Sequence, residues 1–198
     1  MPRKYSMERR TGAVDETRQR IVEATVALHM EKGVQATSMQ DIAARASVSL
    51  GTVYRHFPTV DELLPACGSH TFELNPPPSE SAFDSLAGID RPAALISALY
   101  KHFQATERAY VVGYAEAPQF PVLRDFMNAI DTNMRLLAAE AVAPLDLSAE
   151  ETNIFVALID FNTWYAFRRA GFTTAESIRV VCEIATERLT HDPGKRMV

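Results

Sequence analysis

The feature that most constrains this chain is a pair of short helices predicted over residues 37–57, separated by a tight turn. Ser38, followed three residues later by Asp41, is typical of the N-terminal cap of a first helix. Ser49 predicts the cap of a second helix, which ends near His56. Two capped helices with so short a turn between them indicate one compact motif.

The apolar side chains of this stretch are spaced so that two crossed helices share one small core. Ala43 is expected at the crossing, because helices that meet at a steep angle tolerate only a small side chain there. The side chains left outside on the second helix form a surface able to enter a major groove. They are Leu50, Gly51, Thr52, Tyr54 and Arg55. The spacing predicts a helix-turn-helix; the alternative is an ordinary helical hairpin in another all-helical domain.

The same stretch resembles the tetracycline-repressor (TetR) family of transcriptional regulators. The matching residues are Asp41-Ile42-Ala43, Val48-Ser49, Gly51-Thr52-Val53-Tyr54 and His56-Phe57-Pro58, with Arg20 to Thr25 and Lys32-Gly33-Val34 upstream. The likeness covers roughly residues 15–65, and beyond them only length and helical pattern agree. It implies an all-α fold of about nine helices: a three-helix DNA-binding domain, then a larger helical ligand-binding and dimerisation domain.

Composition bounds the class of protein. The chain has 198 residues and 47% hydrophobic content, enough for one large or two small cores. No stretch approaches the roughly 20 apolar residues of a membrane span, and no apolar run follows the basic N-terminus as in a secretory signal. Cys67 and Cys182 lack metal or redox spacing and indicate a reducing compartment. We therefore expect a soluble, cytoplasmic protein.

Charge is distributed unevenly along the chain. The whole chain carries a net charge of −5, but residues 1–60 hold nine Lys or Arg against six Asp or Glu. This part is therefore at +3 and the remainder at −8. Such asymmetry would hold the basic end toward phosphates, although many globular proteins show it by chance.

The domain organisation follows from these signals. Residues 1–14 are basic without helical periodicity, which predicts a flexible arm. Its cations, which are Arg3, Lys4, Arg9 and Arg10, would follow a minor groove or serve only solubility. Residues 15–58 form the expected helix-turn-helix domain, whose first helix runs from about 15 to 32 and ends at Gly33. Residues 59–198 form the expected ligand-binding and dimerisation domain.

Caps and breakers predict the later helices. Thr59 and Glu62 predict the start of a fourth helix, and Pro65 predicts that it is kinked or short. Pro76-Pro77-Pro78 predicts an extended segment that serves as a spacer or, alternatively, as a recognition motif for a partner. Four further helices are expected: one from about 90 to a break around 117–118, and three over about 121–142, 148–170 and 173–189.

The resemblance also implies which residues contact DNA. Tyr54 and His56 would bind phosphates, and Thr52 and Arg55 would read base edges. Gly51 would let the backbone approach closely. The full predicted set is Thr37, Ser38, Ser49, Leu50, Gly51, Thr52, Tyr54, Arg55 and His56. Thr37 and Ser38 would present hydroxyl or backbone N–H donors at a helix start.

This chain departs from the family pattern at three positions. Leu50 and Val60 stand where lysine is common, which should weaken phosphate binding unless Arg45 or the arm compensates. Leu50 would alternatively contact a thymine methyl. Ser47 replaces a frequent glycine in the turn, which indicates a strained turn.

The resemblance further implies a small effector bound among the later helices. Its expected lining residues are His102, Phe103, Tyr110, Phe126, Met127, Met134, Phe161, Trp164 and Tyr165. The alternative for each is plain core, the commoner role of aromatic and Met side chains at helical spacing. The last two helices of each subunit are expected to pair with their copies in a homodimer.

The predicted function is therefore a sequence-specific DNA-binding regulator, a repressor released from a palindromic operator by a small molecule. An activator of the same fold is the alternative. An enzyme is disfavoured, because the five histidines are scattered and no nucleophile elbow or glycine-rich phosphate loop occurs. No catalytic residue, metal or cofactor is predicted. A protein-binding adaptor has only the proline run in its favour.

Overall fold

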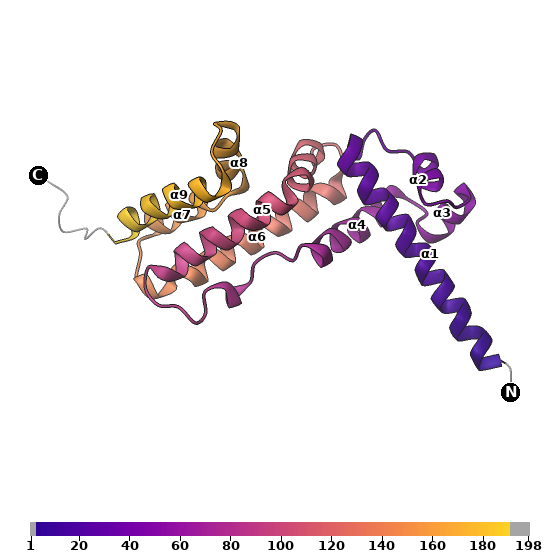
Figure 1. Ribbon diagram of the computed structural model, residues 1–198, viewed down its shortest axis with the longest axis horizontal. Coiled ribbons are helices and arrows are strands. Elements are labelled where there is room, and N and C mark those ends of the chain that lie inside the picture. Colours follow the sequence, from indigo (N-terminus) through magenta and orange to yellow (C-terminus); the bar gives the residue numbers. More distant parts are fainter. Residues whose placement is uncertain (1–2, 191–198) are drawn as a thin grey trace, which may run out of the picture. The chain divides into compact units, whose positions relative to one another are not determined.

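The computed structural model describes the backbone of residues 3–190 and the side chains of residues 14–190. This part of the chain contains helices and no strand (Figure 1). Its nine α-helices are α1 (Arg3–Lys32), α2 (Met39–Arg45), α3 (Leu50–His56), α4 (Val60–Leu74), α5 (Asp90–Glu116), α6 (Pro121–Val142), α7 (Ala149–Leu158), α8 (Phe161–Arg169) and α9 (Thr174–Leu189). Two 3₁₀ turns, Glu80–Ala82 and Ala143–Leu145, complete them. The predicted all-α class is confirmed.

The chain forms two compact units. The first unit holds the residues up to Leu74 together with Val111–Met127, and the second holds Asn75–Tyr110 and the residues from Asn128 onward. Helices α5 and α6 therefore contribute residues to both units. The sequence prediction placed everything after residue 58 in one domain, whereas the structure groups α4 and the end of α5 with the helix-turn-helix.

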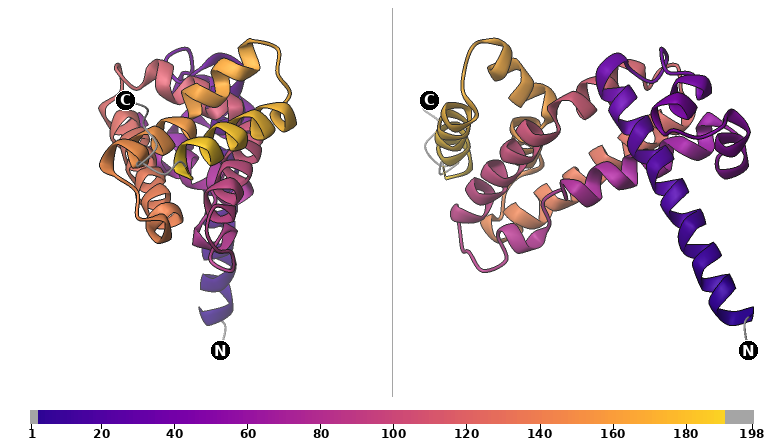
Figure 2. Two further views of the ribbon diagram at one scale, coloured as in Figure 1. Left: turned by 90° about the vertical axis from the view of Figure 1, so that its left-hand side faces the viewer. Right: turned by 45° about the vertical axis from the view of Figure 1, so that its right-hand side comes forward.

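The core of the first unit explains why α2 and α3 fold where they do. Helix α2 contacts both α1 and α3 (Figure 2). Ala43, the residue expected at the helix crossing, is buried in the core that the three helices share, and Val53 and Phe57 of the α3 region are almost completely buried. The same core contains Ile21, Val22, Ala24, Leu28, Ile42, Ala46, Leu63 and Cys67. This shared core fixes the orientation of α3.

Helix α1 differs from the prediction at its N-terminus. It begins at Arg3, so the backbone of residues 3–14 is helical where a flexible arm was expected. Adding residues to an existing helix avoids the costly nucleation step, and Gly12 alone in this stretch is a strong helix breaker. The side chains of the predicted arm lie outside the described residues.

Helix α4 was expected to be kinked or short, and it is not short: it continues through Pro65 for 15 residues. Pro65 faces solvent, and the opposite face of α4 buries Leu63, Leu64 and Cys67, which offsets the lost backbone hydrogen bond. Gly68 does not end the helix either. A Cβ at Gly68 would lie 2.5 Å from the ring of Phe126, so this glycine permits a close approach of α6.

The second unit buries the apolar faces of α5, α6 and α7 to α9. The predicted single helix over 148–170 is wrong: the chain leaves the helix at Ile159 and restarts at Phe161 as α8. The side chain of Asp160 accepts a 2.8 Å hydrogen bond from the backbone N–H of Asn162 and caps the new helix. No Gly or Pro marks this break, so helical periodicity alone did not reveal it.

Candidate nucleic-acid interface

The second helix of the motif, α3, begins at a well-formed cap. The hydroxyl of Ser49 accepts a 3.1 Å hydrogen bond from the backbone N–H of Thr52 and lies 2.9 Å from the Thr52 hydroxyl. Ser47 in the preceding turn has a φ of 55°, which confirms the strain expected where glycine is frequent. The predicted helix-turn-helix geometry is therefore present, and Ser49 is the N-terminal cap of α3.

The exposed face of α3 carries the residues that were expected to meet DNA. Tyr54 is 47% exposed, although its aromatic ring would be favoured in a core. Arg55 is also exposed, and Thr52 and His56 are half-buried. A Cβ at Gly51 would meet only the Ser49 hydroxyl, at 3.9 Å. No contact within the fold therefore requires a glycine at this position. The absence of a side chain at Gly51 leaves room for another molecule to approach the surface of α3.

Two apolar departures from the family pattern have structural reasons. Leu50 was expected outside, but it is half-buried and packs against the core of the first unit. Val60 packs against Val34, Leu64 and Val112. Both side chains stabilise the first unit by packing on its buried residues. Leu50 is therefore less available to a thymine methyl than we expected.

Thr37 and Ser38 use their hydroxyl and backbone N–H donors in hydrogen bonds within the fold. The Thr37 hydroxyl donates to the Gly33 carbonyl at 2.7 Å, and the Thr37 N–H donates to Val34. The Ser38 hydroxyl and N–H both donate to the carboxylate of Asp41, at 2.7 and 2.9 Å. These residues hold α2 in place, and neither offers a donor to a phosphate in this arrangement.

Several cations near the motif are already paired. Lys32 Nζ lies 2.8 Å from the Asp41 carboxylate, and this hydrogen bond, with those from Ser38, holds the Asp41 pKa well below its usual range. Arg45 donates two hydrogen bonds to Glu31, at 2.8 and 2.7 Å. Arg45 is therefore a poor substitute for a missing lysine. Arg55 carries the positive charge of α3.

His56 ends α3 beside Arg55. Partial burial lowers the pKa of His56, and the neighbouring charges of Arg55 and Arg18 lower it further. Arg18 stacks over Phe57, with its guanidinium carbon 4.8 Å from the ring centroid. His56 is therefore largely neutral at pH 7 in the free protein, and a nearby phosphate would favour its protonation.

One contact with the turn before α2 was not predictable from local sequence patterns. The carboxylate of Glu116, at the end of α5, accepts a 2.8 Å hydrogen bond from the N–H of Gln35, 81 residues away. Gln35 lies in the turn between α1 and α2. Val112 of α5 also packs on Val34 in the same turn. The end of α5 is therefore part of the same compact unit as the helix-turn-helix.

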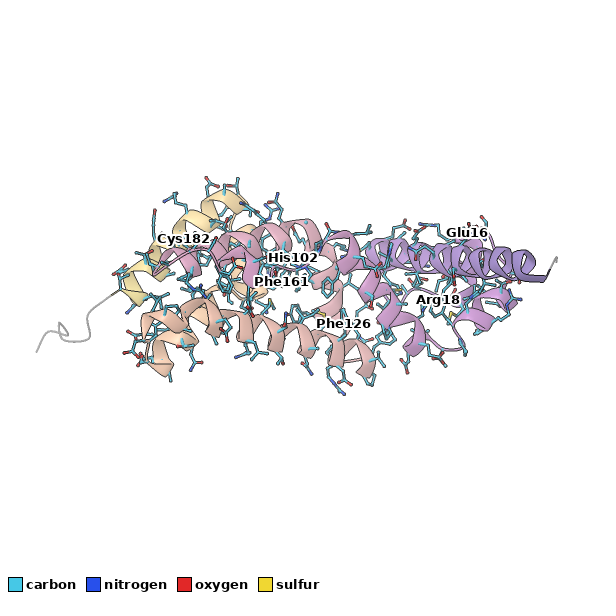
Figure 3. All side chains as sticks on the ribbon, turned by 90° about the horizontal axis from the view of Figure 1, so that it is seen from below. Glu16, Arg18, His102, Phe126, Phe161 and Cys182 are labelled. Atoms are coloured by element: carbon cyan, nitrogen blue, oxygen red, sulfur yellow. The ribbon has the colours of Figure 1, made fainter. Side chains whose placement is uncertain are left out.

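The predicted effector-lining residues are divided between the two units. Phe126 and Met127 belong to the first unit, where Phe126 stacks on Phe72 at 5.6 Å. The other seven belong to the second unit. Of these, six form one continuous set of ring contacts: His102, Phe103, Tyr110, Phe161, Trp164 and Tyr165. Figure 3 labels two of them, His102 and Phe161.

Within the described residues, no group of three His, Cys, Asp or Glu side chains is placed to hold a metal ion. Between residues 3 and 190, no helix is both long and apolar enough to cross a membrane. What the fold and the exposed face of α3 define is a helix-turn-helix domain, a class of domain that enters the major groove of DNA.

The comparison with known proteins specifies this class further. The family model for bacterial regulatory proteins of the tetR family matches residues 21–67, which include the whole helix-turn-helix. This part of the chain is therefore a DNA-binding domain of the tetR family type.

The chain is 33% identical over 133 residues to the HTH-type transcriptional repressor Rv3405c of Mycobacterium tuberculosis. That alignment covers 62% of this chain and 66% of the relative, slightly less than two thirds of its length. It is 27% identical over 202 residues to the HTH-type transcriptional repressor KstR of Rhodococcus jostii, covering 94% of this chain and 88% of the relative.

Solved structures share the fold. A transcriptional regulator from Rhodococcus sp. Rha1 matches with a TM-score of 0.68 at 15% identity, covering 86% of this chain and 96% of that one. The multidrug binding protein EbrR, in complex with imidazole, matches with a TM-score of 0.61 at 23% identity, covering 91% and 98%. Both likenesses extend well beyond the helix-turn-helix.

Proposed function

We propose that this chain is a repressor that binds a palindromic operator through α3 and leaves it when a small molecule binds the second unit. The observation that supports this most directly is the exposed face of α3, where Gly51, Tyr54 and Arg55 have no role in the core. Rv3405c and KstR are both named repressors. EbrR is a multidrug binding protein of the same fold, which supports the effector part of the proposal.

In this proposal, Arg55 reads a base and Tyr54 and His56 bind phosphates. An arginine pairs with a guanine through two hydrogen bonds, which contribute about 1–3 kcal/mol of discrimination. Gly51 admits the sugar-phosphate backbone close to α3. With few unpaired lysines near the motif, affinity depends strongly on these contacts.

We further propose a homodimer through α8 and α9, which would present two copies of α3 to the two half-sites. Ile184 of α9 supports this proposal, because it is 37% exposed although it is a large apolar side chain. Ile184→Glu should convert a dimer to monomers in sedimentation velocity and weaken operator binding. A variant that stays dimeric would place the interface elsewhere.

The test of DNA binding is a gel-shift titration on the DNA upstream of the chain's own gene, followed by operator selection. The wild-type chain should bind with an affinity that falls as salt rises. Arg55→Ala should relax sequence preference at one base position. Arg124→Ala removes the same charge from an exposed site on α6 and serves as the control.

Two results would be informative against the proposal. If Arg55→Ala weakens binding equally on all sequences, Arg55 contacts only phosphate. If the wild-type chain shows no salt-sensitive DNA binding at all, the proposed function is wrong.

A further inference from the structure

The indole of Trp164 contains a buried donor without a partner. Trp164 is fully buried in α8, and its Nε1 makes no hydrogen bond within the described part of the chain. A buried N–H left unpaired costs about 1–3 kcal/mol, and most such groups in native proteins are satisfied. Among the described residues, the other buried side-chain atom in this state is the Thr174 hydroxyl at the start of α9. The indole donor therefore needs an explanation.

The polar groups around Trp164 are, by contrast, paired. The Tyr100 hydroxyl donates to the Leu158 carbonyl at 2.7 Å, and the Thr106 hydroxyl donates to the His102 carbonyl at 2.6 Å. The Tyr110 hydroxyl lies 3.3 Å from Nε2 of His102. These hydroxyl and imidazole groups of the second unit therefore have hydrogen-bond partners, whereas the indole N–H of Trp164 has none.

The surroundings of Trp164 are aromatic. Its ring lies 5.6 Å from Phe161, 5.9 Å from Phe103 and 6.4 Å from Tyr165. Phe161 stacks nearly parallel on Tyr110 at 4.9 Å and on Tyr165 at 5.5 Å. Figure 3 labels His102 and Phe161 within this group. A flat apolar group is the kind of ligand that stacks favourably on aromatic rings.

The charge near Trp164 is balanced. Arg168 lies over the indole at 5.9 Å and is 3.6 Å from the carboxylate of Glu107. Burial lowers the pKa of His102 and so favours its neutral form. Because a buried ion without an opposite charge is strongly disfavoured, an uncharged ligand suits this place better than an anion.

We propose that Trp164 Nε1 donates a hydrogen bond to the effector, and that the effector is a flat, mostly apolar, uncharged molecule with one carbonyl-type acceptor. The inference rests on the proposed effector-responsive function and names the chemistry of its ligand.

The test compares 1-indanone with indane, two flat molecules that differ by one carbonyl. Trp164 is the sole tryptophan of the chain, so a ¹⁵N-labelled sample has one indole N–H signal. Indanone should move that signal to higher ¹H frequency, and indane should move it much less. In calorimetry, the indanone-to-indane affinity ratio should fall about five- to tenfold in Trp164→Phe, which lacks the donor. Phe172→Leu changes a half-buried aromatic side chain that packs edge-on against Phe167, outside this group of rings, so it keeps the indole and should leave the ratio unchanged.

Several outcomes would overturn the inference. They are an indole signal that indanone does not move, an affinity ratio that Trp164→Phe does not change, and failure of both molecules to bind. The NMR experiment uses the wild-type chain, so it remains decisive if Trp164→Phe unfolds. Operator binding is measured separately: if it is present while the ligand tests fail, only this inference is wrong, and if it is absent, the proposed function fails.

Discussion

Glu116 and Gln35 are joined by a 2.8 Å hydrogen bond from the Gln35 backbone N–H to the Glu116 carboxylate. The other carboxylate oxygen of Glu116 lies against Gly33, which has a φ of 89° and ends α1. One side chain from the end of α5 therefore closes the turn that leads into the helix-turn-helix. Any displacement of the end of α5 would act directly on that turn.

The first prediction concerns this contact. Glu116→Ala should destabilise the chain by about 0.5–1.5 kcal/mol, because the Gln35 N–H loses its partner. Gly33→Ala should destabilise it by about 1–2 kcal/mol from the left-handed backbone conformation alone, and further because the new Cβ displaces the Glu116 carboxylate. Urea unfolding of both variants measures these effects.

The double variant supplies the control. With Glu116 already absent, Gly33→Ala has no hydrogen bond left to break. The destabilisations of the two single variants should therefore add up to about 1 kcal/mol more than the destabilisation of the double variant. Strict additivity would mean that the Gly33 and Glu116 positions do not interact in solution.

Gly51 gives a prediction in which stability and binding change in opposite directions. Gly51→Ala should stabilise α3 by about 0.5 kcal/mol, because alanine is the better helix former and its Cβ meets open space. The same methyl group should weaken operator binding severalfold if DNA approaches this face closely. Thermal unfolding and fluorescence anisotropy measure the two effects. Unchanged operator affinity would show that the DNA backbone does not approach Gly51.

His29 predicts an acid sensitivity of the fold. It is 6% exposed in α1, and burial lowers its pKa from 6.5 to about 4. The unfolded chain then binds more protons than the folded one between those values, so stability is complete above pH 6.5 and falls as the pH drops toward 4. The full contribution is about 3 kcal/mol.

The variant His29→Phe isolates this contribution. Urea unfolding at pH 7 and pH 4.5 should show a smaller loss of stability for His29→Phe than for the wild type, because His102 and the carboxylates contribute equally to both. Parallel pH profiles of the two proteins would show that His29 is solvated or paired when charged.

His56 predicts a pH dependence of DNA binding. Its pKa is lowered in the free protein by burial and by Arg55 and Arg18, and a phosphate beside it would raise it. Binding then takes up a proton, so operator affinity should rise as the pH falls from 7.5 to 6, up to about tenfold for each unit by which the pKa rises. Anisotropy titrations at constant ionic strength test this, and His56→Gln should remove the dependence.

Much of the first unit was predictable from local sequence. The caps at Ser38 and Ser49 and the break at Gly33 depend on hydrogen bonds and backbone angles of neighbouring residues, so a short pattern suffices to place them. The same holds for the caps at Ser148 and Thr173. The start of α8 was missed, because Asp160 caps it without any helix breaker nearby.

The candidate sites were only partly predictable. Sequence named Tyr54 and Arg55 correctly as side chains of the exposed face, because helical periodicity alone separates that face from the core. Sequence placed Leu50 outside, whereas Leu50 is half-buried against the core. It also did not reveal that the Thr37 hydroxyl is bonded to the Gly33 carbonyl. Whether a hydroxyl is already bonded, or a leucine already packed, depends on side chains that the pattern does not specify.

The sequence by itself determined the resemblance of the helix-turn-helix to the tetR family, the helical class and the position of α3, since these follow from contacts within a few residues or one short motif. Only the tertiary structure decided that Glu116 closes the α1–α2 turn, that Phe126 belongs with the DNA-reading unit, and that the Trp164 donor is left unpaired. Each of these depends on groups far apart in the chain, whose distances are set by how whole helices pack.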